Sequence, residues 1–197
     1  MAWAPAYASA DDLKVFVRVT DAVDDPQVAL AVEAASRAVD QHCRRQFGKV
    51  DAAAARRYTA QLVCGRWAVD VDDLSTATGA TVAVPAGPVD VFDLEPINAA
   101  ADGRPFTRLT VGDGAAHLPT GTRHEVTVTG VWGWSAVPGA VKQATLLQAS
   151  RFLARRDSPY GIAGSPDAGS EVRLLARVDP DVAVILGPYV RRGWAFV

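Results

Sequence analysis

The middle of the chain, residues 56–134, is a series of short β-leaning runs separated by turn residues. The runs are "RRYTAQLV", "RWAVDVDDL", "ATVAV", "VDVFDL", "FTRLTV" and "HEVTVTGVWGW", and turn clusters such as "AADGRP" and "PTGT" lie between them. This alternation is typical of strands joined by hairpins and short loops. We therefore expect about five or six short strands in an antiparallel sandwich or barrel-like block.

Helix signals precede this block. Ser9 and Asp12 have the spacing of a capping box and predict a short helix in "SADDLKVFVRV". Asp25 followed by Pro26 is a second start signal, because a capping carboxylate is followed by proline in the first turn. Apolar residues then recur at three- and four-residue steps, and Gly48 is the expected end of this longer helix.

Helix signals return after Pro138. The segment "VPGAVKQATLLQASRFLARR" is apolar on most sides as far as Arg151, which indicates burial on several sides. In a chain of this size we expect part of that surface to contact another subunit. After the glycine-rich "GIAGSPDAGS", Asp179 and Pro180 repeat the start signal, and Pro188 is expected to stop the last helix.

These patterns predict an α+β fold, in which a small bundle of about four helices carries an inserted antiparallel β sandwich or barrel-like block and an extended C-terminal tail. We assign residues 1–48 and 132–192 to the helical core, 49–131 to the β insertion and 188–197 to the tail. The two helical parts are expected to pack together, with the β block as an excursion between them and not a separate domain.

Composition narrows the function classes. A chain of 197 residues with 49% hydrophobic residues can bury a substantial core, and its formal net charge of −2 argues against a general nucleic-acid binder. No signal peptide is visible, and no apolar run approaches the roughly 20 residues that span a bilayer. Cys43 and Cys64 lack a CxxC spacing, so we expect free, buried thiols.

Catalytic and metal-binding patterns are weak, and we expect no catalytic residue, metal site or cofactor. His42, His117 and His124 form no zinc-ligand motif. "GWSAV" around Ser135 lacks the last glycine of a nucleophile elbow, and "DVDD" at residues 70–73 lacks the glycine and the distal glutamate of a calcium loop, so it is expected to be a solvated turn. An acid–base pair of carboxylates that converge in space stays open.

Two other features each have two interpretations. The pairs Arg44–Arg45 and Arg155–Arg156 fall in the last turns of expected helices, where cations complement the helix dipole. The alternative is a DNA-binding accessory protein that uses these arginines. Trp132 and Trp134, two positions apart, are expected to pack in the core. The alternative is a monomeric carbohydrate- or ligand-binding β module that stacks sugars on them.

Four segments of the chain, taken together, resemble a known family. "DDLKVFV", "VEAASRAVDQHCRRQF", "VTGVWGWSAVPGAVKQATLLQASRFLARRDSPYGIAG" and "VDPDVAVILGPYVRR" follow one another in the order of the head-to-tail connector (adaptor) proteins of long-tailed bacteriophages. The central "INAAADGRPFTRL" is similar to the β insertion of the members from phages that infect actinobacteria. The resemblance spans nearly the whole chain and is most specific from Val137 to Gly164.

The resemblance implies a non-enzymatic virion protein of the phage neck, assembled in the host cytoplasm. Such proteins form a homododecameric ring beneath the portal protein, extend the DNA channel and give the stopper or tail its platform. Packaged DNA would pass through without specific binding, and no membrane is involved. The loop 157–170 would face the channel or a neighbouring subunit.

The resemblance and the apolar third helix together suggest two sets of contact residues. The C-terminal segment, which in the family commonly reaches the portal, would bind it here through Tyr189, Arg191, Arg192, Trp194 and Phe196. Contacts between subunits would involve Val141, Leu147, Arg151, Arg155 and Tyr160.

Overall fold

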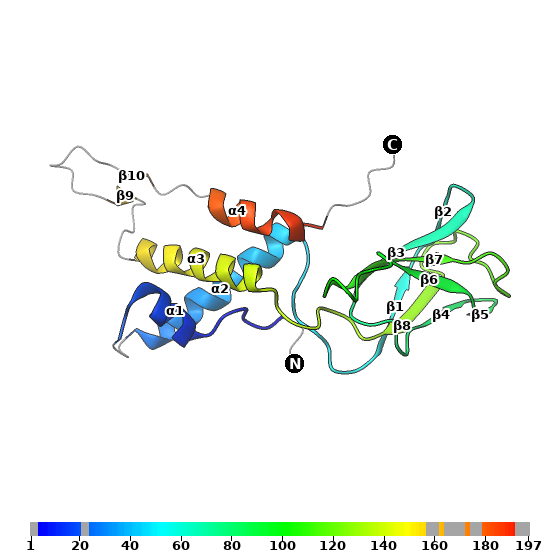
Figure 1. Ribbon diagram of the computed structural model, residues 1–197, viewed down its shortest axis with the longest axis horizontal. Helices are drawn as coiled ribbons and strands as arrows, with labels where there is room; N and C mark the ends of the chain where they lie inside the picture. Colours follow the sequence, from blue (N-terminus) through cyan, green and yellow to red (C-terminus); the bar gives the residue numbers. More distant parts are fainter. Residues whose placement is uncertain (1–3, 21–23, 157–161, 164–171, 174–178, 192–197) are drawn as a thin grey trace. The chain divides into compact units, whose positions relative to one another are not determined.

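The computed structural model describes residues 4–20, 24–156, 162–163, 172–173 and 179–191, and the chain divides into two compact units (Figure 1). The β unit contains Ala4 and residues 47–136, and the helical unit contains the described residues of 5–46 and 137–197. Residues 4, 47–48 and 132–136, which were expected in the helical core, therefore fall in the β unit. The β block is a compact unit of its own.

The helical unit combines the two ends of the chain (Figure 1). Its elements are α1 (Ala10–Val17), α2 (Asp25–Cys43), α3 (Gly139–Arg156), α4 (Pro180–Leu186), the 3-10 turn η2 (Gly187–Tyr189) and an antiparallel pair of short strands, β9 (Ile162–Ala163) and β10 (Val172–Arg173). Helices α1, α2 and α3 contact one another, and α4 packs on α3. The expected association of the two helical parts is confirmed.

The helix ends follow the sequence signals in part. The expected capping box is present, since the Ser9 hydroxyl accepts the Asp12 N–H and the Asp12 carboxylate accepts the Ser9 N–H. Asp179 caps α4 as expected. The expected end of α2 at Gly48 is wrong: the helix ends at Cys43, where Arg44 adopts a left-handed conformation with φ 54°. There the N–H groups of Arg44 and Arg45 both reach the Asp40 carbonyl, which stops the regular helical pattern.

The core of the helical unit lies between α1, α2 and α3. Leu13 of α1 is completely buried, and the stripe of α2 that faces it includes Val28, Val32 and Ala35. Ala149 of α3 completes the contact. Burial of one face from each helix is what the three- and four-residue spacing of these apolar positions predicts.

The β unit contains eight strands in two four-stranded antiparallel sheets. One sheet has the order β1-β8-β4-β5 and the other has the order β2-β3-β7-β6. The strands are β1 (Ala54–Tyr58), β2 (Gln61–Val63), β3 (Arg66–Leu74), β4 (Thr81–Val84), β5 (Gly87–Val89), β6 (Phe92–Glu95), β7 (Phe106–Val111) and β8 (Val126–Gly130). There are more strands than expected because runs such as "RRYTAQLV" divide at a turn.

The two sheets of the β unit share one core, which confirms the expected antiparallel sandwich. Val69 of β3 pairs with Leu109 of β7, and both side chains are completely buried. On the other sheet, Val82 pairs with Val128 and both point into the same core. Strand alternation places every second side chain on this inner face.

The chain enters and leaves the β unit at one place. Lys49 and Gly133 form an isolated antiparallel bridge, and the N–H of Trp134 donates to the carbonyl of Gly48 at 3.0 Å. Gly133 has φ 110°, and a Cβ there would lie 2.0 Å from the Gly48 carbonyl oxygen. Only glycine permits this close approach of the two backbone segments.

Candidate interaction surfaces

The described residues contain no group of three or more His, Cys, Asp or Glu side chains that could hold a metal ion. The "DVDD" segment lies in β3, so the expected solvated turn is wrong. Its carboxylates accept hydrogen bonds within the unit. Asp70 accepts from Arg108 at 3.0 Å and Asp72 from Arg56 at 2.7 Å, while buried Asp73 accepts from the indole N–H of Trp134.

The two cysteines differ in exposure. Both are free, as expected, but Cys64 is exposed and only Cys43 is buried, so the expectation of two buried thiols is wrong for Cys64. Burial raises the pKa of the Cys43 thiol to about 11, which keeps it protonated and unreactive near neutral pH.

No helix among the described residues has the length and apolarity needed to cross a membrane.

Trp132 and Trp134 are core residues. Trp132 is completely buried, and its indole N–H donates to the Ala54 carbonyl at 2.7 Å while the Arg56 guanidinium lies 4.6 Å from its ring centre. Trp134 is 3% exposed and packs against Phe47. Neither ring offers a face to solvent, so the sugar-stacking interpretation is wrong.

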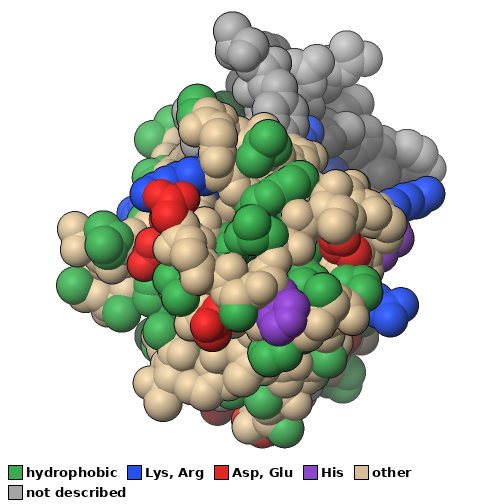
Figure 2. Space-filling view, turned by 90° about the vertical axis from the view of Figure 1, so that its right-hand side faces the viewer, with side chains coloured by type: hydrophobic (Ala, Val, Ile, Leu, Met, Phe, Trp, Pro, Cys, Tyr) green, Lys and Arg blue, Asp and Glu red, His purple; other side chains and the backbone are tan. Residues whose placement is uncertain are grey.

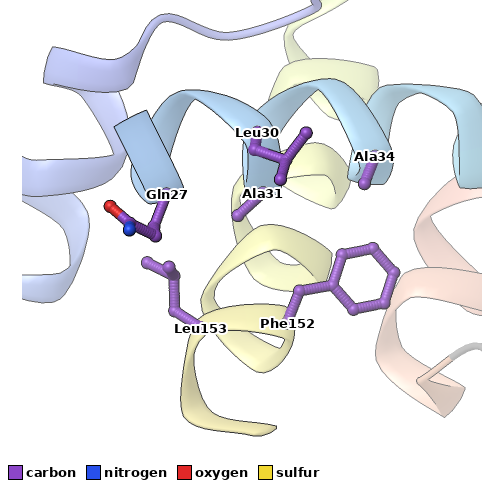
Figure 3. Close-up of a pocket in the computed structure, with 6 residues that line it drawn as sticks. All are labelled: Gln27, Leu30, Ala31, Ala34, Phe152 and Leu153. Atoms are coloured by element: carbon purple, nitrogen blue, oxygen red, sulfur yellow. The ribbon is translucent and has the colours of Figure 1, made fainter. Parts of the chain in front are cut away.

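A surface groove runs between α2 and α3 of the helical unit. It has a volume of about 400 Å³ and is lined by Gln27, Leu30, Ala31, Ala34, Phe152 and Leu153. Figure 3 shows the side chains of the two helices facing each other across it. Leu30 is 66% exposed, which is high for a leucine in the middle of a long helix. We call this feature the α2–α3 groove.

The seam between α2 and α3 is closed farther along. There Val182 and Leu186 of α4 meet Val39 of α2 and Gln148 of α3 around a small internal space. Arg151 binds the carboxylate of Asp179, the cap of α4, and so fixes where α4 begins. The short helix thus covers one part of the seam and leaves the α2–α3 groove open.

A second exposed apolar surface lies on α1. Val15 is 80% exposed and Phe16 is 38% exposed, and both border a shallow hollow that is also lined by Asp11, Asp12 and Leu146. Asp12 is held by Lys142 of α3 at 2.8 Å. We call Asp11, Val15 and Phe16 the α1 face.

The residues expected between subunits fall into different environments. Val141 is completely buried inside the helical unit, so it has no surface left for a neighbour. Leu147, Arg151 and Arg155 are half-buried on α3, and Tyr160 lies outside the described residues. Most of the apolar surface of α3 is used within its own unit, which accounts for its apolar sequence.

Two of the five expected portal-binding residues lie at the end of the described chain. Tyr189 closes η2 and Arg191 follows it, and both are half-buried. The N–H of Arg191 donates to the Cys43 carbonyl at 2.8 Å, which attaches this segment to the end of α2. Arg192, Trp194 and Phe196 lie outside the described residues.

The arginine pairs do not form a common basic surface in the described residues. Arg44 is exposed and Arg45 half-buried, and they follow α2 instead of lying in its last turn. Arg155 lies in the last turn of α3, as expected. The face drawn in Figure 2 carries mainly hydrophobic and uncharged side chains, with Lys and Arg side chains toward its edges.

Sequence reasoning missed Leu30, Phe152, Val15 and Phe16 as surface residues. A signal was present for Leu30, because it lies off the apolar stripe formed by Val28, Val32 and Val39. A large apolar residue outside the buried stripe of a helix indicates either a second packing partner or an exposed contact surface.

Comparison with known proteins finds similarity among solved structures. No protein-family model matches the chain, and no curated protein matches it. A solved structure is similar to it over 91% of this chain and 97% of that chain, with 22% sequence identity and a TM-score of 0.45. That structure is the neck of a native GTA particle computed with C12 symmetry.

Proposed function

We propose that this protein is a structural component of a phage neck. In this role it is a ring-forming head-to-tail adaptor that docks under the portal, extends the DNA channel and supports the stopper or tail. The proposal rests mainly on how the helical unit is assembled from the chain. The sequence segments that resemble the adaptor family lie on both sides of the β block, and they fold together as α1, α2, α3 and α4.

The exposed surfaces suit an assembly protein better than an enzyme. The α2–α3 groove and the α1 face are apolar, whereas the carboxylates that could serve an acid–base reaction in β3 are held in internal hydrogen bonds. Large apolar side chains that lie together at a surface are typical of protein contact sites. The formal net charge of −2 is compatible with a channel wall that does not hold DNA through many phosphate contacts.

Two contact surfaces are part of this proposal. The segment from Gly187 onward would dock on the portal, with Tyr189, Arg191, Arg192, Trp194 and Phe196 as contact residues. Leu147, Arg151, Arg155 and Tyr160 would lie near subunit contacts, and Val141 is left out because it is buried in its own unit. The ring would be a homododecamer, as the family resemblance implies.

Disruption of the gene in its phage tests the proposed role. We expect DNA-filled heads without tails in electron micrographs, and complementation with the full chain should restore tailed particles. Antibody labelling of complemented particles should mark the junction of head and tail. Normal tailed, infectious particles from the disrupted phage would contradict the proposal.

A further inference from the structure

We propose that α4 is a cover that leaves the seam between α2 and α3 by a local opening, and that Gln148 beneath it keeps this opening easy. The other helices of the helical unit would stay packed together while α4 is away. This opening is a property of the single chain, so it does not depend on the proposed neck role.

The helix α4 is too short to be stable without its packing. It has seven residues, and isolated helices shorter than about 12–15 residues are marginal in water. Its buried side chains are Val182 and Leu186, whereas Val184 is 78% exposed. The helical state of α4 therefore depends largely on the contact that Val182 and Leu186 make with α2 and α3.

The seat of α4 contains a buried polar atom. Gln148 of α3 is 8% exposed, and its side-chain amide oxygen is buried without a hydrogen-bond partner among the described residues. Gln148 lines the small internal space together with Val182 and Leu186, and this space is too small for a water molecule. A buried acceptor without a donor has lost its hydration without compensation. Gln148 therefore makes the closed position of α4 less stable than an apolar side chain would.

A second buried polar side chain on α3 shows the contrast. Thr145 is completely buried, but its hydroxyl donates to the Val141 carbonyl at 2.9 Å. Thr145 is thus satisfied within its own helix whether α4 is present or not. The amide oxygen of Gln148 gains a partner when α4 leaves, because water then reaches it.

A partly exposed ion pair orients the start of α4. Arg151, one helical turn after Gln148 on α3, binds the carboxylate of Asp179, which also caps α4 by accepting the Asp181 N–H at 2.8 Å. The two charged side chains are 22% and 29% exposed, so water and salt weaken their attraction. After α4, the attachment of Arg191 to the Cys43 carbonyl would keep the open helix near the seam.

Opening changes the chemistry of the seam. It would uncover Ala38, Val39 and His42 of α2 beside Gln148, so that an imidazole and an amide become available among apolar side chains. The helix α4 runs directly into the segment from Gly187 onward, for which we propose portal contacts. A partner that binds this segment better when α4 is open would shift the chain toward the open state. Only this last link rests on the proposed function.

Native-state hydrogen exchange followed by NMR tests the opening on the isolated chain. The N–H of Ala183, which donates to the Asp179 carbonyl at 2.9 Å, reports on α4. We expect it to be protected about 100-fold less than the slowest amides of α2. Val32→Ala, in the core between α1, α2 and α3, should lower the protection of the α2 amides and leave Ala183 unchanged, because its contacts persist in the open state. Equal protection of the two helices, or an equal effect of Val32→Ala on both, would overturn a separate opening.

Replacement of Gln148 tests the cause of the opening. Gln148→Met keeps the length of the side chain and removes the unpaired oxygen, so the Ala183 amide should exchange about tenfold more slowly. Gln143→Met, at an exposed position on the same helix, is the matched control and should change nothing. Asp179→Asn keeps a capping side chain but loses the ion pair, and it should speed the exchange about two- to fivefold.

Gln148→Leu provides a second apolar replacement if methionine perturbs the fold. Unchanged or faster exchange of α4 in a folded Gln148→Met or Gln148→Leu protein would overturn the role of Gln148. Failure of both variants to fold would overturn it as well, since a side chain with an unpaired buried oxygen should be replaceable. Normal tailed particles from the disrupted phage, together with the expected exchange rates, would exclude the neck role and leave the cover in place.

Discussion

The indole N–H of Trp134 donates to the carboxylate of Asp73 at 2.9 Å inside the β unit. Asp73 lies near the end of β3, and Trp134 follows the strand that leads out of the unit. Both side chains are at most 3% exposed. The bond therefore ties the segment by which the chain leaves the β unit to the end of β3.

Trp134→Phe should weaken the β unit. Phenylalanine keeps most of the ring contact with Phe47 but removes a donor from a buried carboxylate, and such a loss costs about 1–3 kcal/mol. Urea unfolding followed by circular dichroism measures the change. Trp67→Phe, at a half-buried position in β3, is the control and should cost less. Equal losses for the two variants would argue against a special role for the Trp134 bond.

Gly133→Ala should be among the most destabilising single changes in the chain. The φ of 110° disfavours any side chain, and the new Cβ would lie 2.0 Å from the Gly48 carbonyl oxygen. We expect a loss of at least about 2 kcal/mol in the free energy of unfolding. Thermal unfolding measures the loss. Gly139→Ala, where an added Cβ meets nothing within 4 Å, is the control and should be neutral or slightly stabilising. A Gly133→Ala protein as stable as the parent would refute the close approach.

The Asp12 carboxyl should titrate well below the usual range. The hydrogen bond from Lys142, followed by those from Ser9, lowers the pKa of Asp12 from 3.8 to about 2. Because the folded pKa is depressed, the stabilisation is present above pH 4 and is lost as the pH falls from about 4 to 2. The site is exposed, so the contribution is at most about 0.2–1 kcal/mol.

An NMR titration of the Asp12 carboxyl carbon would locate its midpoint. Lys142→Met should raise the pKa of Asp12 toward 3.8, and Lys49→Met, in the other unit, should not change it. A midpoint near 3.8 in the parent protein would show that the ion pair between α1 and α3 does not form in solution.

Deletion of residues 193–197 should separate folding from assembly. The last backbone hydrogen bond of the described chain, from Arg191 to Cys43, precedes the deletion, so the melting temperature should change little. If Trp194 anchors the chain on the portal, loss of this aromatic costs about 3–5 kcal/mol per subunit, multiplied by the number of subunits in a ring. Phage that carry the deletion should accumulate filled heads without tails, and infectious particles at the parental titre would exclude the anchor.

Local sequence signals predicted the elements well where a single feature determines them. The capping box at Ser9, the cap at Asp179 and the run "FTRLTV" as β7 all appear in the structure. The end of α2 was not predictable in the same way, because Arg44 takes a left-handed conformation that is usually left to glycine or asparagine. The run "RWAVDVDDL" was correctly predicted as a strand and forms β3, but the solvated-turn interpretation of its "DVDD" part was wrong. The arginines that bind these carboxylates, Arg56 and Arg108, lie on other strands and could not be identified from the local sequence.

The candidate surfaces depended on tertiary packing and were mostly beyond sequence reasoning. The apolar pattern of α3 correctly indicated burial on several sides. The sequence does not show, however, whether α4 or a neighbouring subunit covers each side. The groove at Leu30 and Phe152 exists because α4 is short and covers only the other part of the seam. That length depends on where Asp179 meets Arg151, which is a contact distant in sequence.

The bridge between Lys49 and Gly133 brings the two ends of the β unit together. An inserted segment whose ends are neighbours behaves as a cassette: it can be lengthened, trimmed or exchanged without changing the distance that the host fold has to span. The helical unit can therefore keep its packing while the inserted part diverges in sequence and size. Related chains should vary most between Lys49 and Gly133, and a short glycine-containing turn in place of the β unit should leave α2 and α3 able to pack together.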